Sequence, residues 1–305
     1  MDESGSREPE LLAREQGLLP GTHRFSHQAM ATVFGIFCAH EDQSYAAQAA
    51  RAAFDLVDRI ETELTRHRPS SDISRINRLG PGRSARVGSW TLECLLLARR
   101  FYQETGGAFD VSLGSGLESV EPDPAGSAVT VRAPGVRLDL GGIGKGYALD
   151  RAAELLEEWE VTRALLHAGF SSVLALEAPP GRAGWPVTIS LPGAESARVI
   201  ERFQARRAAW GASGIRKKDH ILDPRTRTPV AERAAAWASG GLEALAAVAA
   251  AAGIAASPCA AADALSTAFM IMAPDEIAGF CRHHPGIEAR ILERADAPQL
   301  RRFGS

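Results

Sequence analysis

The sequence lacks most of the features that place a chain in a membrane, secreted or nucleic-acid-binding class. Its 305 residues include four cysteines, which are scattered and form no Cys-x-x-Cys pair. That pattern argues against a disulfide framework and a zinc site, and it is typical of small buried residues in a reducing compartment. No apolar run is long enough to span a bilayer. A formal net charge of −3 gives no general attraction to nucleic acid or anionic lipid.

The N-terminus also lacks a targeting signal. It reads MDESGSREPE, which is polar and acidic, without the basic and apolar regions of a secretory signal and without a lipobox. We therefore expect a cytoplasmic protein. Residues 1–21 are predicted to form a flexible tail. No repeat or low-complexity linker divides the remainder, so residues 22–305 are predicted to form a single domain.

Hydrophobic periodicity predicts a mixture of helices and strands. The clearest helix covers Gln43–Leu64, where apolar residues form one stripe. Residues 27–39 are predicted to be one strand, residues 163–176 a pair of strands broken at Gly169, and residues 118–135 a connection. The other expected elements are helices over residues 89–104, 242–252 and 275–283, and strands over residues 185–191, 206–214 and 287–292.

The most informative stretch is residues 136–159. Val136, Leu138 and Leu140 alternate with polar residues, which predicts a half-buried strand. Four glycines follow within residues 141–146, and apolar residues then recur at helical spacing. A glycine turn that opens a helix favours anion binding, because backbone N–H groups can approach a phosphate there.

Two common glycine fingerprints do not fit this turn. A P-loop requires Ser or Thr after its lysine, but Gly146 follows Lys145. A Rossmann turn requires Gly or Ala three residues after its second glycine, but Tyr147 stands at that spacing from Gly144. The stretch alone therefore leaves two interpretations open, a phosphate or nucleotide site and a tight turn without a ligand.

The complete phrase LDLGGIGKGYALDRA, residues 138–152, resembles the signature of the ApbE-type FAD:protein FMN transferase family. Further phrases similar to the family's signatures follow its chain order: MAT at residues 30–32, GGAFDVSLG at 106–114, HILDPRTRTPV at 220–230 and AADALSTA at 261–268. The resemblance covers about residues 29–272. It implies an ApbE-like, T-fold-related α+β domain, built mainly of antiparallel sheets with helices packed on them.

The chain also departs from the family pattern. His167 stands where the phrase N-A-G-G-D-I has Asn, and Phe170-Ser171-Ser172 replaces its Gly-Asp pair. Any ligand contact made by that Asp therefore cannot be carried over to this chain. Arg227 stands where Gly is usual in the phrase D-P-R-T-G.

The resemblance implies a site for FAD as a substrate. It assigns to FAD Met30 beside the flavin, and Ala108, Phe109 and Asp110 at the adenine end. Lys145 is a candidate to offset the charge of the pyrophosphate, and Gly141 and Ile221 are expected to make further contacts. From the residues alone, each of three side chains has a plainer interpretation. Met30 suits a core, Asp110 suits a turn after a helix, and Lys145 suits a solvated turn.

A metal pair is predicted near the C-terminal end. Asp263 and Thr267 are four residues apart, so they face one side if Asp263 opens a helix. Their oxygens suit Mg²⁺, which takes its remaining ligands from water and phosphate. The alternative is an N-cap followed by a packing residue. The resemblance favours the metal pair and adds the backbone carbonyl of Gly144 as a third ligand.

His220 is the candidate general base, because the resemblance implies that role and histidine titrates near neutral pH. The implied reaction moves FMN from FAD to a Thr or Ser hydroxyl of an acceptor flavoprotein with a DxxTGAT-type motif, and it releases AMP. Two other functions stay open at this point. One is an Mg²⁺-dependent FAD pyrophosphatase, and the other is a flavin-binding protein without catalysis.

Overall fold

The computed structural model describes residues 21–190, 199–214, 222–230, 232–250, 254–294 and 299–304. Its helices are α1 (Gln43–Leu64), α2 (Asp72–Ile76), α3 (Ser89–Glu104), the 3-10 turn η1 (Leu117–Ser119), α4 (Gly144–Glu158), α5 (Leu242–Ala249), α6 (Pro258–Phe269) and α7 (Pro274–His283). Its strands are β1 (Thr22–Ala29), β2 (Thr32–Ala39), β3 (Arg83–Arg86), β4 (Val120–Asp123), β5 (Ala128–Val131), β6 (Ala164–Ala168), β7 (Ser172–Ala175), β8 (Trp185–Ser190), β9 (Val199–Ala205), β10 (Ala208–Gly214), β11 (Leu222–Asp223), β12 (Thr228–Pro229), β13 (Arg233–Gly241), β14 (Ile287–Glu293) and β15 (Leu300–Phe303).

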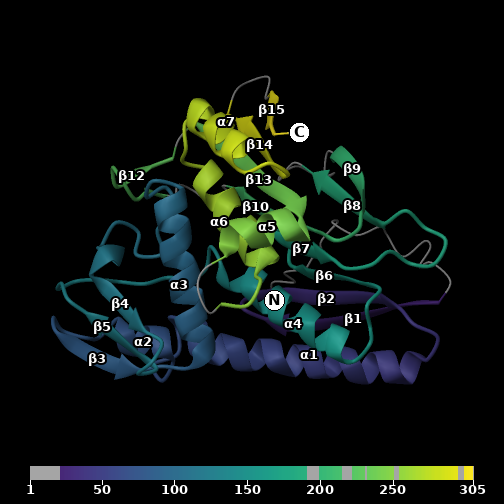
Figure 1. The fold of residues 1–305 in the computed structure, drawn as a ribbon, viewed down its shortest axis with the longest axis horizontal. Helices are drawn as coiled ribbons and strands as arrows, with labels where there is room; N and C mark the ends of the chain where they lie inside the picture. The colour runs from purple at the N-terminus through teal and green to yellow at the C-terminus, as the bar shows by residue number, and fades with distance from the viewer. Residues whose placement is uncertain are drawn as a thin grey trace, which may run out of the picture.

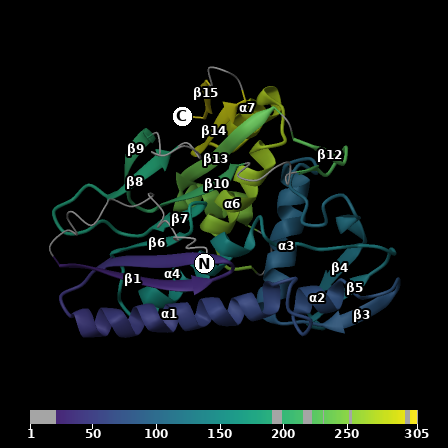
Figure 2. The same ribbon diagram turned by 180° about the vertical axis from the view of Figure 1, so that it is seen from behind.

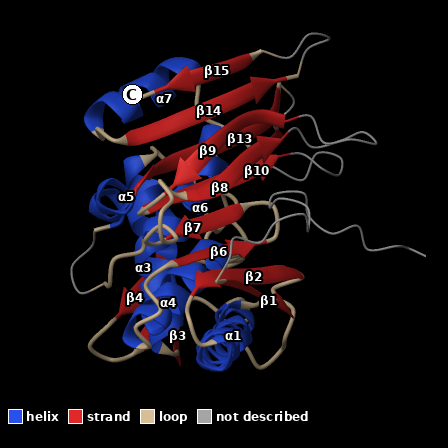
Figure 3. Ribbon diagram, turned by 90° about the vertical axis from the view of Figure 1, so that its right-hand side faces the viewer, coloured by secondary structure: helices blue, strands red, loops and turns tan. Residues whose placement is uncertain are grey.

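An eight-stranded antiparallel sheet organises the molecule, in the order β1-β2-β6-β7-β10-β13-β14-β15. The helices gather on one face of this sheet, as Figure 3 shows. A three-stranded sheet of β3, β5 and β4 lies on the side of α3 that faces away from the main sheet (Figure 1, Figure 2). The expected α+β architecture of antiparallel sheets with helices packed on them is therefore confirmed.

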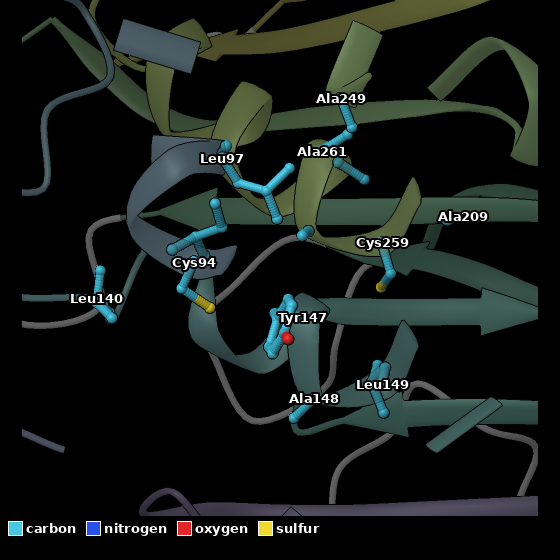
Figure 4. Close-up of a cluster of buried hydrophobic side chains, with 14 of the residues drawn as sticks. Cys94, Leu97, Leu140, Tyr147, Ala148, Leu149, Ala209, Ala249, Cys259 and Ala261 are labelled. Carbon is cyan, nitrogen blue, oxygen red and sulfur yellow. The ribbon is translucent and has the colours of Figure 1, made fainter. Parts of the chain in front are cut away.

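The two faces of the main sheet are covered differently. Successive side chains in a strand point to opposite faces. Accordingly Leu166 and Leu174 join the large core beneath the helices, whereas Leu165 and Val173 pack with Trp185 under the β8–β9 hairpin. Buried side chains from α3, α4, α5 and α6 meet in the large core (Figure 4).

The helix predicted over Gln43–Leu64 is confirmed, and it packs against α4 and β1. The Asp42 carboxylate caps it by accepting hydrogen bonds from the backbone of Ser44 at 2.8 Å and Tyr45 at 3.0 Å. Its apolar stripe is buried. The four cysteines are buried and unpaired, as expected. Among the described residues, no helix is long and apolar enough to cross a membrane.

The prediction of one strand over residues 27–39 is wrong, because the chain reverses in the middle of this stretch. β1 and β2 form an antiparallel hairpin in which Ala29 pairs with Thr32. Met30 and Ala31 make the turn with positive φ angles of 49° and 56°. Such turns normally carry Gly, Asn or Asp, and the absence of these residues concealed the turn. Met30 therefore lies at one end of the main sheet.

The predicted strand over residues 136–140 is also wrong, although its burial pattern is right. Val136, Leu138 and Leu140 are buried, as the alternation indicates. However, the Asn77 side chain takes the place of a neighbouring strand, since its amide donates to the Leu138 carbonyl at 2.9 Å and its oxygen accepts from the Leu138 N–H at 2.7 Å. Alternating apolar residues show that one side of a segment is buried, but they do not show which group pairs with its backbone.

Residues 118–135, predicted to be a connection, form most of the small sheet. β4 and β5 pair as a hairpin, and β5 also pairs with β3. The strand pair predicted around Gly169 is confirmed as β6 and β7. The predicted single domain stays a prediction, and residues 1–20 of the predicted tail lie outside the described residues.

Two glycines allow α6 to approach its neighbours closely. A Cβ atom on Gly211 of β10 would lie 2.1 Å from the carbonyl oxygen of Ala262. A Cβ atom on Gly146 of α4 would lie 2.3 Å from the carbonyl oxygen of Cys259. Both obstacles are backbone atoms, which cannot move aside as the tip of a flexible side chain can. α6 therefore contacts the sheet and α4 at positions where only glycine fits.

We expect Gly211→Ala to lower the free energy of unfolding by about 2 kcal/mol or more, because overpacking of a close backbone contact has a cost of that order. Urea unfolding measures this change. Gly80→Ala is the matched control, because the nearest atom to an added Cβ there is 4.0 Å away. Equal unfolding midpoints for the two variants would contradict the close packing of α6.

Candidate active site

Asp263 lies in the middle of α6 and not at its start, and its four-residue spacing from Thr267 places both side chains on one side of the helix. α6 begins at Pro258, and its first turn is capped from outside by Asp150 of α4. The Asp150 carboxylate accepts hydrogen bonds from the backbone N–H groups of Cys259 and Ala260, both at 2.9 Å. This arrangement excludes the N-cap interpretation of Asp263. It also fixes the start of α6 against α4.

The Asp263 side chain is almost completely buried, with 4% of its surface exposed. Its Oδ2 accepts the backbone N–H of Gly146 at 2.8 Å. The Ser172 hydroxyl lies 2.7 Å from Oδ1 and 2.8 Å from Oδ2. Burial raises the pKa of Asp263 to about 6, while the charge of Lys145 and these hydrogen bonds act in the opposite direction.

Thr267 lies one helical turn beyond Asp263, within a group of hydroxyls. Its Oγ1 is 3.2 Å from the Asp263 carbonyl oxygen and 3.1 Å from Oγ of Ser213, the penultimate residue of β10. Ser213 Oγ is also 3.0 Å from Oγ of Ser266. α6 therefore presents a carboxylate and a hydroxyl toward the same region, as the four-residue spacing predicts.

The glycine corner, residues 141–146, meets this part of α6. A Cβ atom on Gly142 would lie 3.4 Å from Thr267 Oγ1 and 3.2 Å from the Phe109 ring. Together with the hydrogen bond from Gly146 to Asp263, this contact brings together three phrases that are far apart in the sequence. They are the glycine corner, the Ala108-Phe109 segment and the Asp263–Thr267 turn.

The segment predicted to hold adenine is built around Asp110. Its carboxylate accepts the N–H of Ser112 at 2.7 Å, the hydroxyl of Ser112 at 3.0 Å and the N–H of Gly114 at 2.8 Å. Asp110 is thus the turn residue of the plainer interpretation, and its contact with adenine stays a prediction. Ala108 and Phe109 are fully buried, and their contact with adenine also stays a prediction.

Two cationic side chains flank the glycine corner. Lys145 donates from Nζ to the carbonyl oxygen of Gly141 at 3.1 Å. The N–H of Gly141 donates to Asp139 Oδ1 at 2.9 Å, and Arg66 forms an ion pair with Oδ2 of the same carboxylate at 3.0 Å. The sequence interpretation included Lys145 and missed Arg66. Only the folded contact between residues 66 and 139 reveals it.

His220 and Ile221 lie outside the described residues, so their predicted roles stay predictions. The β11–β12 hairpin that follows them contacts the loop after Asp110. Arg227 donates from Nη2 to the Gly114 carbonyl at 2.6 Å. Arg227 also has a φ of 60°, which lies in the left-handed region that favours glycine. Arg227 stands where the phrase D-P-R-T-G has glycine, the residue that adopts this conformation without strain.

The residues present fit a Mg²⁺ ion. A carboxylate has about four acceptor positions, and the hydrogen bonds to Asp263 leave part of that capacity for a cation. Among the residues that the structure describes, no group of three or more His, Cys, Asp or Glu side chains forms a metal cluster. The protein would therefore supply few ligands, and water and phosphate the others, as Mg²⁺ prefers. The Gly144 carbonyl, at the start of α4, stays a predicted ligand.

Because the Asp263 carboxyl is buried, we expect the free energy of unfolding to depend on pH. In protein freed of divalent cations, the pKa of about 6 exceeds the value of an unfolded chain. The stabilisation due to the protonated form is complete below about pH 4 and is lost as the pH rises through about 6. We expect Asp263→Asn to remove this contribution. Between about pH 4 and about pH 7, the free energy of unfolding of the wild type should fall by on the order of 2 kcal/mol relative to that of the variant.

Urea unfolding of both proteins in EDTA, across this pH range, measures the difference. The comparison isolates one carboxyl, because the other titrating groups are common to both proteins. A difference that does not change with pH would show that burial does not disfavour the charged form of Asp263.

Comparison with known proteins connects this geometry to a family. The ApbE family model matches residues 30–130 and 115–291. A curated FAD:protein FMN transferase of Klebsiella pneumoniae (strain 342) is 24% identical over 217 residues, 59% of this chain. The match spans 66% of that protein, just under two thirds of its length.

Solved structures share the fold. The apo form of the flavinyl transferase ApbE of Pseudomonas stutzeri has a TM-score of 0.77 at 19% identity, covering 92% of this chain and 94% of that chain. The flavin transferase ApbE of Vibrio cholerae has a TM-score of 0.75 at 19% identity, covering 93% and 97%. An ApbE protein of Thermotoga maritima has a TM-score of 0.74 at 23% identity, covering 91% and 96%.

The expectation of a transferase agrees with the names of these relatives. The family model covers most of the chain, including the segments that meet around Asp263. The chain therefore belongs to the ApbE family, as its sequence phrases predict.

Proposed function

We propose that this protein transfers FMN from FAD to a Thr or Ser hydroxyl of an acceptor flavoprotein, with Mg²⁺ bound and AMP released. One observation carries the proposal. A buried carboxylate and a hydroxyl on α6 meet a glycine corner that opens a helix. Hard oxygen ligands beside such a corner suit a metal-bound pyrophosphate, the group that FAD contains. The name of the Klebsiella relative supports the same reaction.

The transfer is a substitution at phosphorus. The acceptor oxygen forms a bond to the phosphorus of the FMN half, and the bond from that phosphorus to the bridging oxygen breaks. The hydroxyl proton passes to a base, and AMP leaves with the bridging oxygen. FMN stays joined to the acceptor through a phosphoester. Such a reaction depends chiefly on positioning and on neutralising phosphate charge.

The side chains of this protein would perform the positioning. Asp263, Thr267 and the Gly144 carbonyl would hold Mg²⁺, which when bound neutralises charge on the pyrophosphate. Lys145 adds a positive charge at the glycine corner. Ala108, Phe109 and Asp110 would bind the adenine end through the backbone and the turn that Asp110 organises.

Further contacts would come from the rest of the FAD site. Met30, in the β1–β2 turn, would lie beside the flavin, and Gly141 and Ile221 would provide additional contacts to FAD. His220 would accept the proton of the attacking hydroxyl. Its support is its place in the HILDPRTRTPV phrase, whose described part contacts the Gly114 carbonyl through Arg227.

The acceptor would present its Thr or Ser in a DxxTGAT-type motif. The same site could also direct water instead of a protein hydroxyl at the phosphorus, which would release free FMN and AMP. Product analysis distinguishes transfer from this hydrolysis.

The test is intact-protein mass spectrometry of a DxxTGAT-containing acceptor domain after incubation with the enzyme, FAD and MgCl₂. We expect the acceptor to gain the mass of one FMN phosphoester, with AMP in equal amount, and EDTA to abolish the gain. Asp263→Ala should lower the transfer rate at least about 100-fold. Asp275→Ala, which removes an exposed carboxylate of α7, should leave the rate unchanged.

Three other results would contradict the proposal or the role that it gives to Asp263. Free FMN and AMP without a labelled acceptor would indicate a pyrophosphatase. FAD that is bound but not consumed would indicate a flavin-binding protein without catalysis. Full activity of Asp263→Ala in the presence of Mg²⁺ would remove Asp263 from the reaction.

A further inference from the structure

Ser172 is the first residue of β7 and belongs to the segment that departs from the family phrase. There, Phe170-Ser171-Ser172 replaces a Gly-Asp pair, and the proposed reaction gives these residues no part. Ser172 is fully buried. A buried hydroxyl requires a hydrogen-bonding partner, so the partner of Ser172 indicates what this departure does.

That partner is the Asp263 carboxylate. Ser172 Oγ lies 2.7 Å from Oδ1 and 2.8 Å from Oδ2. An ionised carboxylate only accepts, so the hydroxyl is the donor. The Gly146 N–H approaches Oδ2 from α4 at 2.8 Å. Asp263 is thus held from two sides, by the helix that begins at the glycine corner and by the sheet.

The sheet contact depends on the packing of α6 against β10. Ser172 pairs in register with Gly211, the residue at which any side chain would collide with α6. α6 therefore lies close enough to the sheet for a side chain as short as serine to reach Asp263. The hydrogen bond is a direct consequence of this close approach.

We propose that Ser172 is a positioning residue for the metal site, because its hydroxyl holds the Asp263 carboxylate in the orientation that binds Mg²⁺. This inference rests on the proposed function, in which Asp263 is a metal ligand. Partners that orient a metal ligand through hydrogen bonds typically contribute 10–100-fold to metal affinity. Ser172 would act in this way from the sheet, and the Gly146 N–H from α4.

Two other serines provide matched controls. Ser171 is adjacent in sequence, and its hydroxyl lies 3.4 Å from the Ala168 carbonyl and 3.3 Å from Ser172 Oγ. Ser239 of β13 is buried, and its hydroxyl accepts from Arg290 Nη1 at 3.0 Å. Ser171→Ala therefore tests the neighbouring hydroxyl. Ser239→Ala tests the loss of a buried hydrogen bond whose partner is a different side chain.

The experiment is a titration of thermal unfolding with MgCl₂ at a fixed, saturating concentration of ADP, which supplies phosphate oxygens without the flavin. Ligand binding to the folded state raises the midpoint temperature, so the midpoint reports Mg²⁺ affinity without enzyme turnover. We expect Ser172→Ala to require at least about tenfold more Mg²⁺ for half of the effect. Ser171→Ala and Ser239→Ala should stay within about twofold of the wild type.

The outcomes separate this inference from the proposed function. If the wild type responds to Mg²⁺ and Ser172→Ala responds at the same concentrations, Ser172 has only a structural role and the inference is overturned. If the wild type itself shows no Mg²⁺ response, the metal site fails, and the inference fails with it. If Ser172→Ala does not fold, Ser172→Cys, which keeps the volume and weakens the donor, is judged by the same criterion.

Discussion

The hydrogen bond from the Gly146 N–H to the buried carboxylate of Asp263 is the interaction on which the rest of the structure depends. It joins the glycine corner at the middle of the chain to α6 near its end, 117 residues apart. Burying a carboxylate is unfavourable unless it is hydrogen-bonded or paired with a cation. Asp263 accepts hydrogen bonds from α4 and β7, and a cation beside it would neutralise the charge of its carboxylate.

The fold provides these surroundings by bringing backbones unusually close together. Gly146 and Gly211 let α6 pack directly on α4 and β10, and Asp150 caps the first turn of α6 from α4. The position of Asp263 is thus fixed by contacts along the whole first half of its helix. A site that acts through positioning needs such a rigid support, because an error of about 1 Å is sufficient to lose much of its activity.

The sequence predicted what depends on local patterns. The α1 stripe gave the helix and its buried face, and the family phrases gave the residues that meet around Asp263. Long-range contacts supplied the rest. The strand expected over residues 136–140 instead pairs with the Asn77 side chain, and the Met30–Ala31 turn has no glycine to mark it. No local pattern connects Ser172 with Asp263, which is 91 residues away.

The central claim is that a divalent cation binds between Asp263 and the glycine corner together with the phosphates of a dinucleotide. Anomalous scattering from Mn²⁺, in crystals grown with ADP, locates such an ion directly. We predict one strong peak within coordination distance of an Asp263 carboxylate oxygen and of a phosphate oxygen. Bound ADP with no peak at Asp263, or with its peak at another site, would contradict the claim.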